Sequence, residues 1–130
     1  RDLNARHNPD LMVALGTPAN MGAILYEEGI LETNTGLHAG ESETSRMLAI
    51  APETVHMERA VDCVPTVTRP YLSYGSIFRA SPAGVWGEPS YATAEKGEKI
   101  LSRQTEVIVE ELNRAFAYME GKEKFNYSYF

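Results

Sequence analysis

A long amphipathic segment near the end of the chain limits most strongly the folds that this sequence can adopt. From residue 93 to residue 120, apolar or small residues recur at steps of three and four, at Ala94, Gly97, Leu101, Ile108, Leu112, Ala115 and Met119. This spacing predicts an α-helix of about seven turns with one apolar side, and Gly121 is a typical helix end. A chain of 130 residues with 43% hydrophobic content can bury that side in one globular domain.

The first part of the chain indicates an α/β fold. Residues 1–8 contain good helix formers and end in Asn8-Pro9, a pair that closes a helix and starts an extended segment. The apolar run at residues 11–15 is short and bounded by Pro9 and Gly16, which is typical of a strand buried on both faces of a parallel sheet. We therefore expect a single domain over residues 1–130, part of a mainly parallel sheet with flanking helices. Because this α/β unit begins within a helix, we expect further chain upstream.

Two shorter helices are predicted in the first half of the chain. Residues 20–30 have helical spacing with Gly29 as the stop, and residues 42–51 form a helix that Pro52 ends. Residues 61–91 show no sustained periodicity and predict extended segments and ordered loops, which in a compact domain are more often functional or interface-forming than idle. This region holds the aromatic residues Tyr71, Tyr74, Phe78 and Trp86.

Composition excludes several classes of partner. The 18 acidic residues outnumber the 12 basic ones, so the chain lacks the positive charge that binds nucleic-acid phosphates. No apolar run approaches the ~18 residues that span a bilayer, so we expect no membrane partner. The single cysteine, Cys63, allows neither an intramolecular disulfide nor a thiolate zinc site, and a small buried residue is its favoured role over a nucleophile. We expect a cytoplasmic location.

The segment from His38 to Ser45 places an imidazole and two carboxylates where a glycine turn enters a helix. Histidine suits proton transfer near neutral pH, and a carboxylate at a helix start can bind a divalent metal. The same residues have a structural explanation, in which Ser42 caps the helix, Glu41 and Glu43 complement its dipole and His38 is a satisfied loop residue. Taken alone, this segment favours the structural explanation.

A second segment favours a functional explanation of residues 38–45 over the structural one. Residues 84–97, Gly-Val-Trp-Gly-Glu-Pro-Ser-Tyr-Ala-Thr-Ala-Glu-Lys-Gly, join a glycine-rich loop to the start of the final helix. Together with the earlier His-Ala-Gly, two residues, Glu-Thr-Ser at 38–45, they resemble the creatininase family of amidohydrolases. That family's pattern continues with Gly-Val-x-Gly-(Asp/Glu)-Pro-x-x-Ala-Thr-Ala-Glu-(Lys/Glu)-Gly, and the resemblance extends from about residue 1 to residue 120.

The resemblance implies an enzyme with two divalent metal ions (Zn, Mn or Fe) that hydrolyses a C–N bond in a small cyclic amide or formamide. His38 matches the family histidine that donates a proton to the substrate or accepts one from it. Glu43 matches the acid of the Glu-Thr-Ser motif and is expected to bind a metal or to lie directly behind the metals. Glu41 stands at a variable position and is expected on the solvated surface. The candidate substrate contacts are Asn34, Gly40 and Trp86, although loop aromatics more often belong to a core or a subunit contact.

The sequence also departs from the family pattern at the positions of the metal ligands. The other metal ligands of the family lie in a Glu-x-His segment with a following Asp and in an Asn-Gly-His-Gly-Gly-Asn loop, and neither occurs here. His7 and His56 fit no ligand spacing and are expected to be exposed or capping. We therefore expect the C-terminal half of a creatininase-like domain, active on its small-molecule substrate only with a companion N-terminal half or subunit, in a homo- or hetero-oligomer.

The residues before the motif histidine bear on the substrate. Creatinine-hydrolysing members carry a Trp and a Glu shortly before the motif histidine, where this sequence has Asn34 and Leu37. Creatinine is therefore not the expected substrate. The alternative to an enzyme is a non-catalytic subunit or degenerate family member that serves assembly, and a binding module without hydrolysis is a third possibility.

Overall fold

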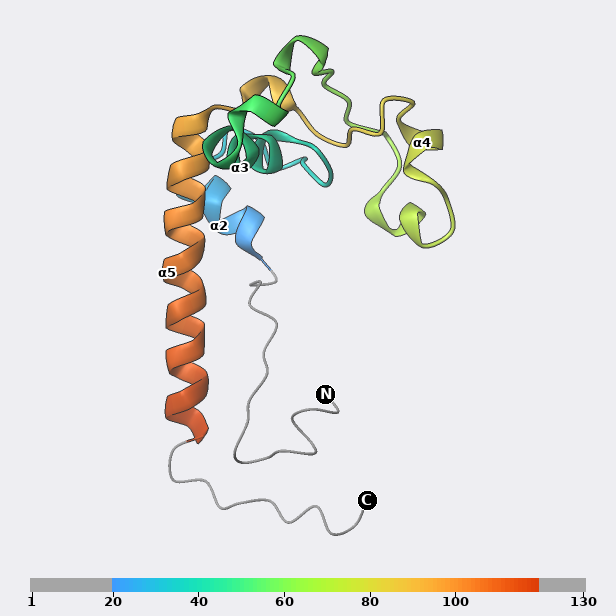
Figure 1. Ribbon diagram of the computed structural model, residues 1–130. Helices are drawn as coiled ribbons and strands as arrows, with labels where there is room; N and C mark the ends of the chain where they lie inside the picture. The colour runs from blue at the N-terminus through green and yellow to red at the C-terminus, as the bar shows by residue number, and fades with distance from the viewer. Residues whose placement is uncertain (1–19, 120–130) are drawn as a thin grey trace. The chain divides into compact units, whose positions relative to one another are not determined.

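The computed structural model describes residues 20–119 and is helical with long connecting loops (Figure 1). Residues 20–105 form one compact unit, and the described part of a second unit is residues 106–119 at the end of the last helix. The elements are α2 (Met21–Glu27), α3 (Glu41–Ile50), η1 (Pro52–Thr54), η2 (Met57–Arg59), η3 (Arg69–Ser73), α4 (Ile77–Ala80), η4 (Pro89–Tyr91) and α5 (Ala94–Met119).

The predicted helices form close to their expected bounds. The helix expected at residues 20–30 is α2, and Gly29 takes the left-handed conformation at φ 71° just after it, as a helix stop does. The helix expected at 42–51 is α3, which begins one residue earlier. Its N-cap is Gly40, without a side-chain hydrogen bond, so Ser42 is not the cap. The long helix expected at 93–120 is α5.

The prediction of a mainly parallel sheet is wrong for the described residues. Residues 20–119 contain no strand, and their extended segments meet only in isolated antiparallel bridges, His38 with Trp86 and Cys63 with Gly87. Glycines, prolines and short 3-10 turns flank these bridges, so the pairing does not propagate into a ladder. The strand expected at residues 11–15, the helix end at 1–8 and the tail from residue 122 lie outside the described residues.

A small apolar core and three polar residues, Glu41, Ser45 and Ser81, fill the interior of residues 20–105. Its buried apolar side chains are Met21, Leu25, Leu31, Trp86, Ala92 and Ile100. From α3 the fully buried residues are Glu41 and Ser45, both polar. The described helices include none that is both long and apolar enough to cross a membrane.

The backbones of α3 and α5 touch at Gly97. A Cβ atom added there would lie 2.0 Å from the carbonyl oxygen of Ser45 and 2.8 Å from the Cβ of Ala49. The Ser45 hydroxyl also accepts a hydrogen bond from the N–H of Thr93 at 3.2 Å, at the start of α5. Only glycine allows the two helices this close, so Gly97 and Ser45 of the sequence motifs have packing roles.

Substitution of Gly97 tests this contact. Gly97→Ala should lower the free energy of unfolding by about 3 kcal/mol, because the added methyl group overlaps backbone atoms that cannot move aside as a side chain would. Gly22→Ala is the matched control, since Gly22 lies within α2 with nothing within 4 Å of its added Cβ. It should stabilise by about 0.5 kcal/mol through helix propensity. Urea unfolding of both variants measures the difference, and equal stabilities would contradict the described packing.

Candidate active site

Three glycines allow the loop before α3 to lie against a second loop. A Cβ atom at Gly40 would be 3.3 Å from the Cα atoms of both Gly36 and Gly87, and one at Gly87 would be 2.8 Å from the Cα of Gly40. Gly87 also has φ 148°, in the region that favours glycine. The glycines of both sequence motifs therefore form one backbone contact.

Backbone hydrogen bonds then fix His38 in place. The N–H groups of Leu37 and His38 donate to the carbonyl oxygen of Trp86 at 2.7 and 3.1 Å, and the N–H of Trp86 donates to His38 O at 2.8 Å. On the other edge, Gly87 exchanges hydrogen bonds with Cys63 at 2.7 and 2.9 Å. The segment that carries His38 is thus paired to a segment that is itself paired on its far side.

The structure brings the side chains of His38 and Glu43 together. His38 Nδ1 lies 3.8 Å from Glu43 Oε2, and the two side chains are 61% and 48% exposed. The same Oε2 accepts a hydrogen bond from the N–H of Ala39, a residue with φ 50°. A glutamate in the first turn that bonds back to the N-terminal side of its own helix is a variant of the capping box. Both groups face solvent, where a ligand can reach them.

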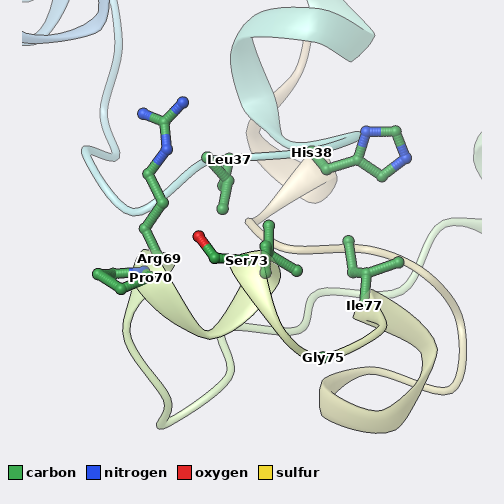
Figure 2. A pocket seen from close by; sticks show the side chains of 8 residues that line it. Leu37, His38, Arg69, Pro70, Ser73, Gly75 and Ile77 are labelled. Atoms are coloured by element: carbon green, nitrogen blue, oxygen red, sulfur yellow. The ribbon is translucent and has the colours of Figure 1, made fainter.

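His38 also lines an open pocket of about 800 Å³, a volume in the usual range for small-molecule sites (Figure 2). The lining residues are Leu37, His38, Arg69, Pro70, Leu72, Ser73, Gly75 and Ile77. They come from the loop before α3, from η3, from the turn that follows η3 and from the start of α4. Figure 2 shows His38 and Arg69 at opposite ends of this group, with Leu37 and Ser73 between them.

The expectation that Glu41 lies on the solvated surface is wrong. Its residue is 1% exposed, and its carboxylate accepts hydrogen bonds from Glu32 N at 3.0 Å, Thr33 N at 2.8 Å and Thr33 Oγ1 at 2.9 Å. Lys96 Nζ, from the first turns of α5, donates to Glu41 Oε1 at 2.6 Å and to Glu32 Oε1 at 2.6 Å. Enough donors surround the carboxylate to replace the water that burial removes.

These partners shift the pKa values of both groups. Burial by itself would raise the pKa of Glu41, but the hydrogen bonds from Lys96, Glu32 and Thr33 together hold it below its ordinary value. Burial would likewise lower the pKa of Lys96, but its bonds to Glu32 and Glu41 raise it. The pair is therefore ionised at neutral pH.

Comparison with known proteins decides the family. The creatininase family model, described as creatinine amidohydrolase, matches residues 1–112. The chain belongs to the creatininase family.

Individual relatives agree with this assignment. The chain is similar to the mycofactocin precursor peptide peptidase of Mycobacterium ulcerans (strain Agy99), with 38% identity over 80 residues that cover 59% of this chain and 32% of that protein. It is 35% identical over 97 residues to the creatinine amidohydrolase of Pseudomonas putida, covering 71% of this chain and 35% of that protein. The crystal structure of a Bacteroides fragilis NCTC 9343 protein assigned as a creatinine amidohydrolase has a TM-score of 0.55 and 30% identity, covering 96% of this chain and 49% of that chain. The chain thus spans about a third of the length of these curated relatives.

The residues predicted from the creatininase pattern occupy different environments. Asn34 is exposed and lies outside the pocket lining, and Gly40 is buried in the glycine contact. Trp86 is 5% exposed and belongs to the core, and it does not line the pocket. His56 is exposed, as expected, with Nδ1 3.2 Å from Glu58 Oε1. Of the predicted site residues, His38 and Glu43 are thus the pair that the fold presents together.

These two side chains alone do not make a metal site. No group of three His, Cys, Asp or Glu residues suitable for a metal ion occurs within residues 20–119. In this part of the chain no group donates to Glu43 Oε1, so this oxygen is available to a cation. The described residues therefore do not by themselves enclose a metal ion.

Sequence reasoning missed Arg69, Ser73 and the ion pair of Glu41 with Lys96. One signal for the ion pair was present. A lysine in the first turn of a helix is unfavourable beside the positive end of the helix dipole, so Lys96 indicates a nearby acidic partner. No comparable signal marks Arg69, because its place in the pocket depends on how the loop at residues 69–75 folds.

Neutralising Glu41 tests its role in the fold. Glu41→Gln should lower the free energy of unfolding at pH 7 by about 2–3 kcal/mol, because the largely buried ammonium group of Lys96 then faces a neutral amide and keeps only the exposed carboxylate of Glu32 as a charged partner. Since the pKa of Glu41 is lower in the folded state, its stabilisation is present above the unfolded-state pKa and is lost as the pH falls through the folded-state value. The variant should therefore lose less stability than the parent between pH 7 and acid pH.

Glu95→Gln is the control for this experiment. Glu95 is exposed and pairs with Lys99 at 2.7 Å on the surface of α5. Its removal should leave the urea midpoint at pH 7 unchanged within error. If Glu41→Gln behaved in the same way, the buried pair would not hold this part of the fold together.

Proposed function

We propose that the chain forms part of a metal-dependent amidohydrolase that cleaves a C–N bond of a cyclic amide or formamide in a small molecule. The observation that carries the proposal is an accessible histidine, His38, beside the carboxylate of Glu43 at the end of a pocket. Membership of the creatininase family supports a hydrolase. The activity itself is proposed for the assembled protein, since the chain covers only part of its relatives.

His38 is proposed to transfer the proton. Its Nδ1 faces Glu43 Oε2 at 3.8 Å, so a small rotation of the imidazole makes Nδ1–H a donor to the carboxylate. That hydrogen bond selects the tautomer whose Nε2 is free to accept a proton and later to give it to the leaving nitrogen. Backbone pairing with Trp86 holds the main chain of His38 beside the pocket while this happens.

Two divalent ions, Zn, Mn or Fe, complete the proposal. When bound, they lower the pKa of water and polarise the carbonyl group of the substrate. From this chain, Glu43 contributes through Oε1, and the remaining ligands come from a companion N-terminal half or subunit. We also propose that this assembly is a homo- or hetero-oligomer.

The pocket does not favour creatinine. The residue directly before the motif histidine is Leu37, an apolar side chain of the pocket lining, where creatinine-hydrolysing members carry a glutamate. Asn34 replaces their tryptophan and is exposed. The named relatives differ in substrate, since one is a creatinine amidohydrolase and another is a peptidase for a mycofactocin precursor peptide. We propose an amide other than creatinine.

Two substitutions in the assembled protein test the function. His38→Ala should lower kcat by about 100- to 10,000-fold, as expected when a general acid–base group is removed. Glu43→Gln should lower metal content or kcat by about 10- to 100-fold. Steady-state kinetics and elemental analysis of the same samples measure both effects.

A second histidine–glutamate pair supplies the control. His56 and Glu58 are likewise close and exposed but lie outside the pocket lining, so His56→Ala and Glu58→Gln should keep parental activity and metal content. An assembled protein that folds, binds no metal and hydrolyses no amide would contradict the proposal. That outcome would instead favour a non-catalytic subunit that serves assembly.

A further inference from the structure

Arg69 is a cationic side chain for which residues 20–119 supply no ion-pair or hydrogen-bond partner. Most lysines and arginines of the described residues contact a glutamate, namely Arg59, Lys96, Lys99, Arg103 and Arg114. The guanidinium of Arg69 is exposed and makes no ion pair or side-chain hydrogen bond within residues 20–119, and it lines the pocket. In a chain of net charge -6, the described part thus leaves an arginine unpaired beside the candidate site.

The other walls of the pocket favour an anion at that end. Among residues 20–119, the lining includes no aspartate or glutamate that could neutralise Arg69 or repel a negative ligand. Between Arg69 and His38 lie Leu37 and Ser73, whose hydroxyl is a possible donor, and Leu72 adds a further apolar side chain to the lining. An apolar middle with a cation at one end suits a molecule whose negative group is separated from its reacting bond (Figure 2).

The turn that carries Arg69 is held by its own packing. The ring of Tyr71 lies so close to Gly75 that a Cβ atom there would be 2.3 Å from the ring. The N–H of Gly75 donates to Tyr71 O at 2.7 Å, and the ring of Tyr74 meets that of Tyr71 edge-on at 5.4 Å. The wall that includes Arg69 is therefore formed before a ligand arrives, which reduces the entropy cost of binding.

We propose that Arg69 binds a carboxylate or phosphate group of the substrate, at the end of the pocket away from His38. The planar guanidinium can give two parallel hydrogen bonds to either group. The substrate class is then an anionic amide whose charged group is a few bonds from the C–N bond that is hydrolysed. This inference rests on the proposed function for the reaction, although anion binding can be measured without turnover.

The experiment compares three formamides in the assembled, metal-loaded protein. N-formyl-β-alanine carries a carboxylate, N-formyl-2-aminoethyl phosphate carries a phosphate, and N-formyl-β-alaninamide is neutral. Dissociation constants are measured in the His38→Ala background, which keeps the probes intact, and kcat/KM is measured with His38 present. Both quantities, the dissociation constant and kcat/KM, are determined with Arg69 intact and with the substitutions Arg69→Gln, Arg69→Lys and Arg79→Gln. Arg79, in α4, is an exposed arginine outside the pocket lining and is the matched control.

We expect at least one anionic probe to bind about 10-fold more tightly than the neutral one. Arg69→Gln should remove this preference through KM rather than kcat, Arg69→Lys should restore part of it, and Arg79→Gln should keep it. The preference should shrink as ionic strength rises, because the site is open to solvent. Which anionic probe binds more tightly distinguishes a carboxylate from a phosphate.

Other outcomes separate the inference from the proposed function. Equal binding of all three probes, or an equal loss for all three in Arg69→Gln, overturns the inference even if the probes are hydrolysed. Arg69-dependent anion binding without hydrolysis of any amide supports the anion site and counts against the hydrolase. The binding constants thus decide the inference, and turnover decides the function.

Discussion

The carboxylate of Glu41 joins three segments that are distant in the sequence. It belongs to the first residue of α3, and it accepts hydrogen bonds from the backbone N–H groups of the loop at residues 32–33. It also accepts a hydrogen bond from Lys96, in the first turns of α5. Burying a charge in this way is unfavourable unless every lone pair finds a donor, and here the donors come from all three segments. Such a pair adds little net stability over an apolar one, but it admits few alternative arrangements. The position of His38, a few residues along the same loop, therefore depends on a contact that takes no direct part in chemistry.

The sequence predicted the helices well and the rest of the fold less well. α3 and α5 follow from periodicity, which depends only on neighbours along the chain. The parallel sheet was wrong because the extended segments of the described residues meet in single bridges, such as His38 with Trp86. Glu41 was misplaced because its burial depends on Lys96, 55 residues later. No local pattern reports a partner at that distance.

In the candidate site, too, some residues were predictable from the sequence and others were not. His38 and Glu43 are five residues apart across a turn, so their proximity was predictable from the motif itself. Arg69 and Ser73 reach the pocket through the fold of an irregular loop, which periodicity does not describe. Several residues of the creatininase pattern, such as Gly87 and Gly97, serve close backbone contacts. A match to the pattern therefore identifies the fold more directly than the chemistry, and the exposed pair His38 and Glu43 is where chemistry has to be tested.

The crossing of α3 and α5 at Gly97 has a mechanical consequence. With no side chain between the two backbones, neither helix can slide or roll past the other without collision. Side-chain layers elsewhere in proteins adapt by changing rotamers, and this junction has none to change. The separation of α5 from α3, the helix that bears Glu41 and Glu43, is therefore set by backbone atoms at Ser45 and Gly97 and not by side-chain rotamers.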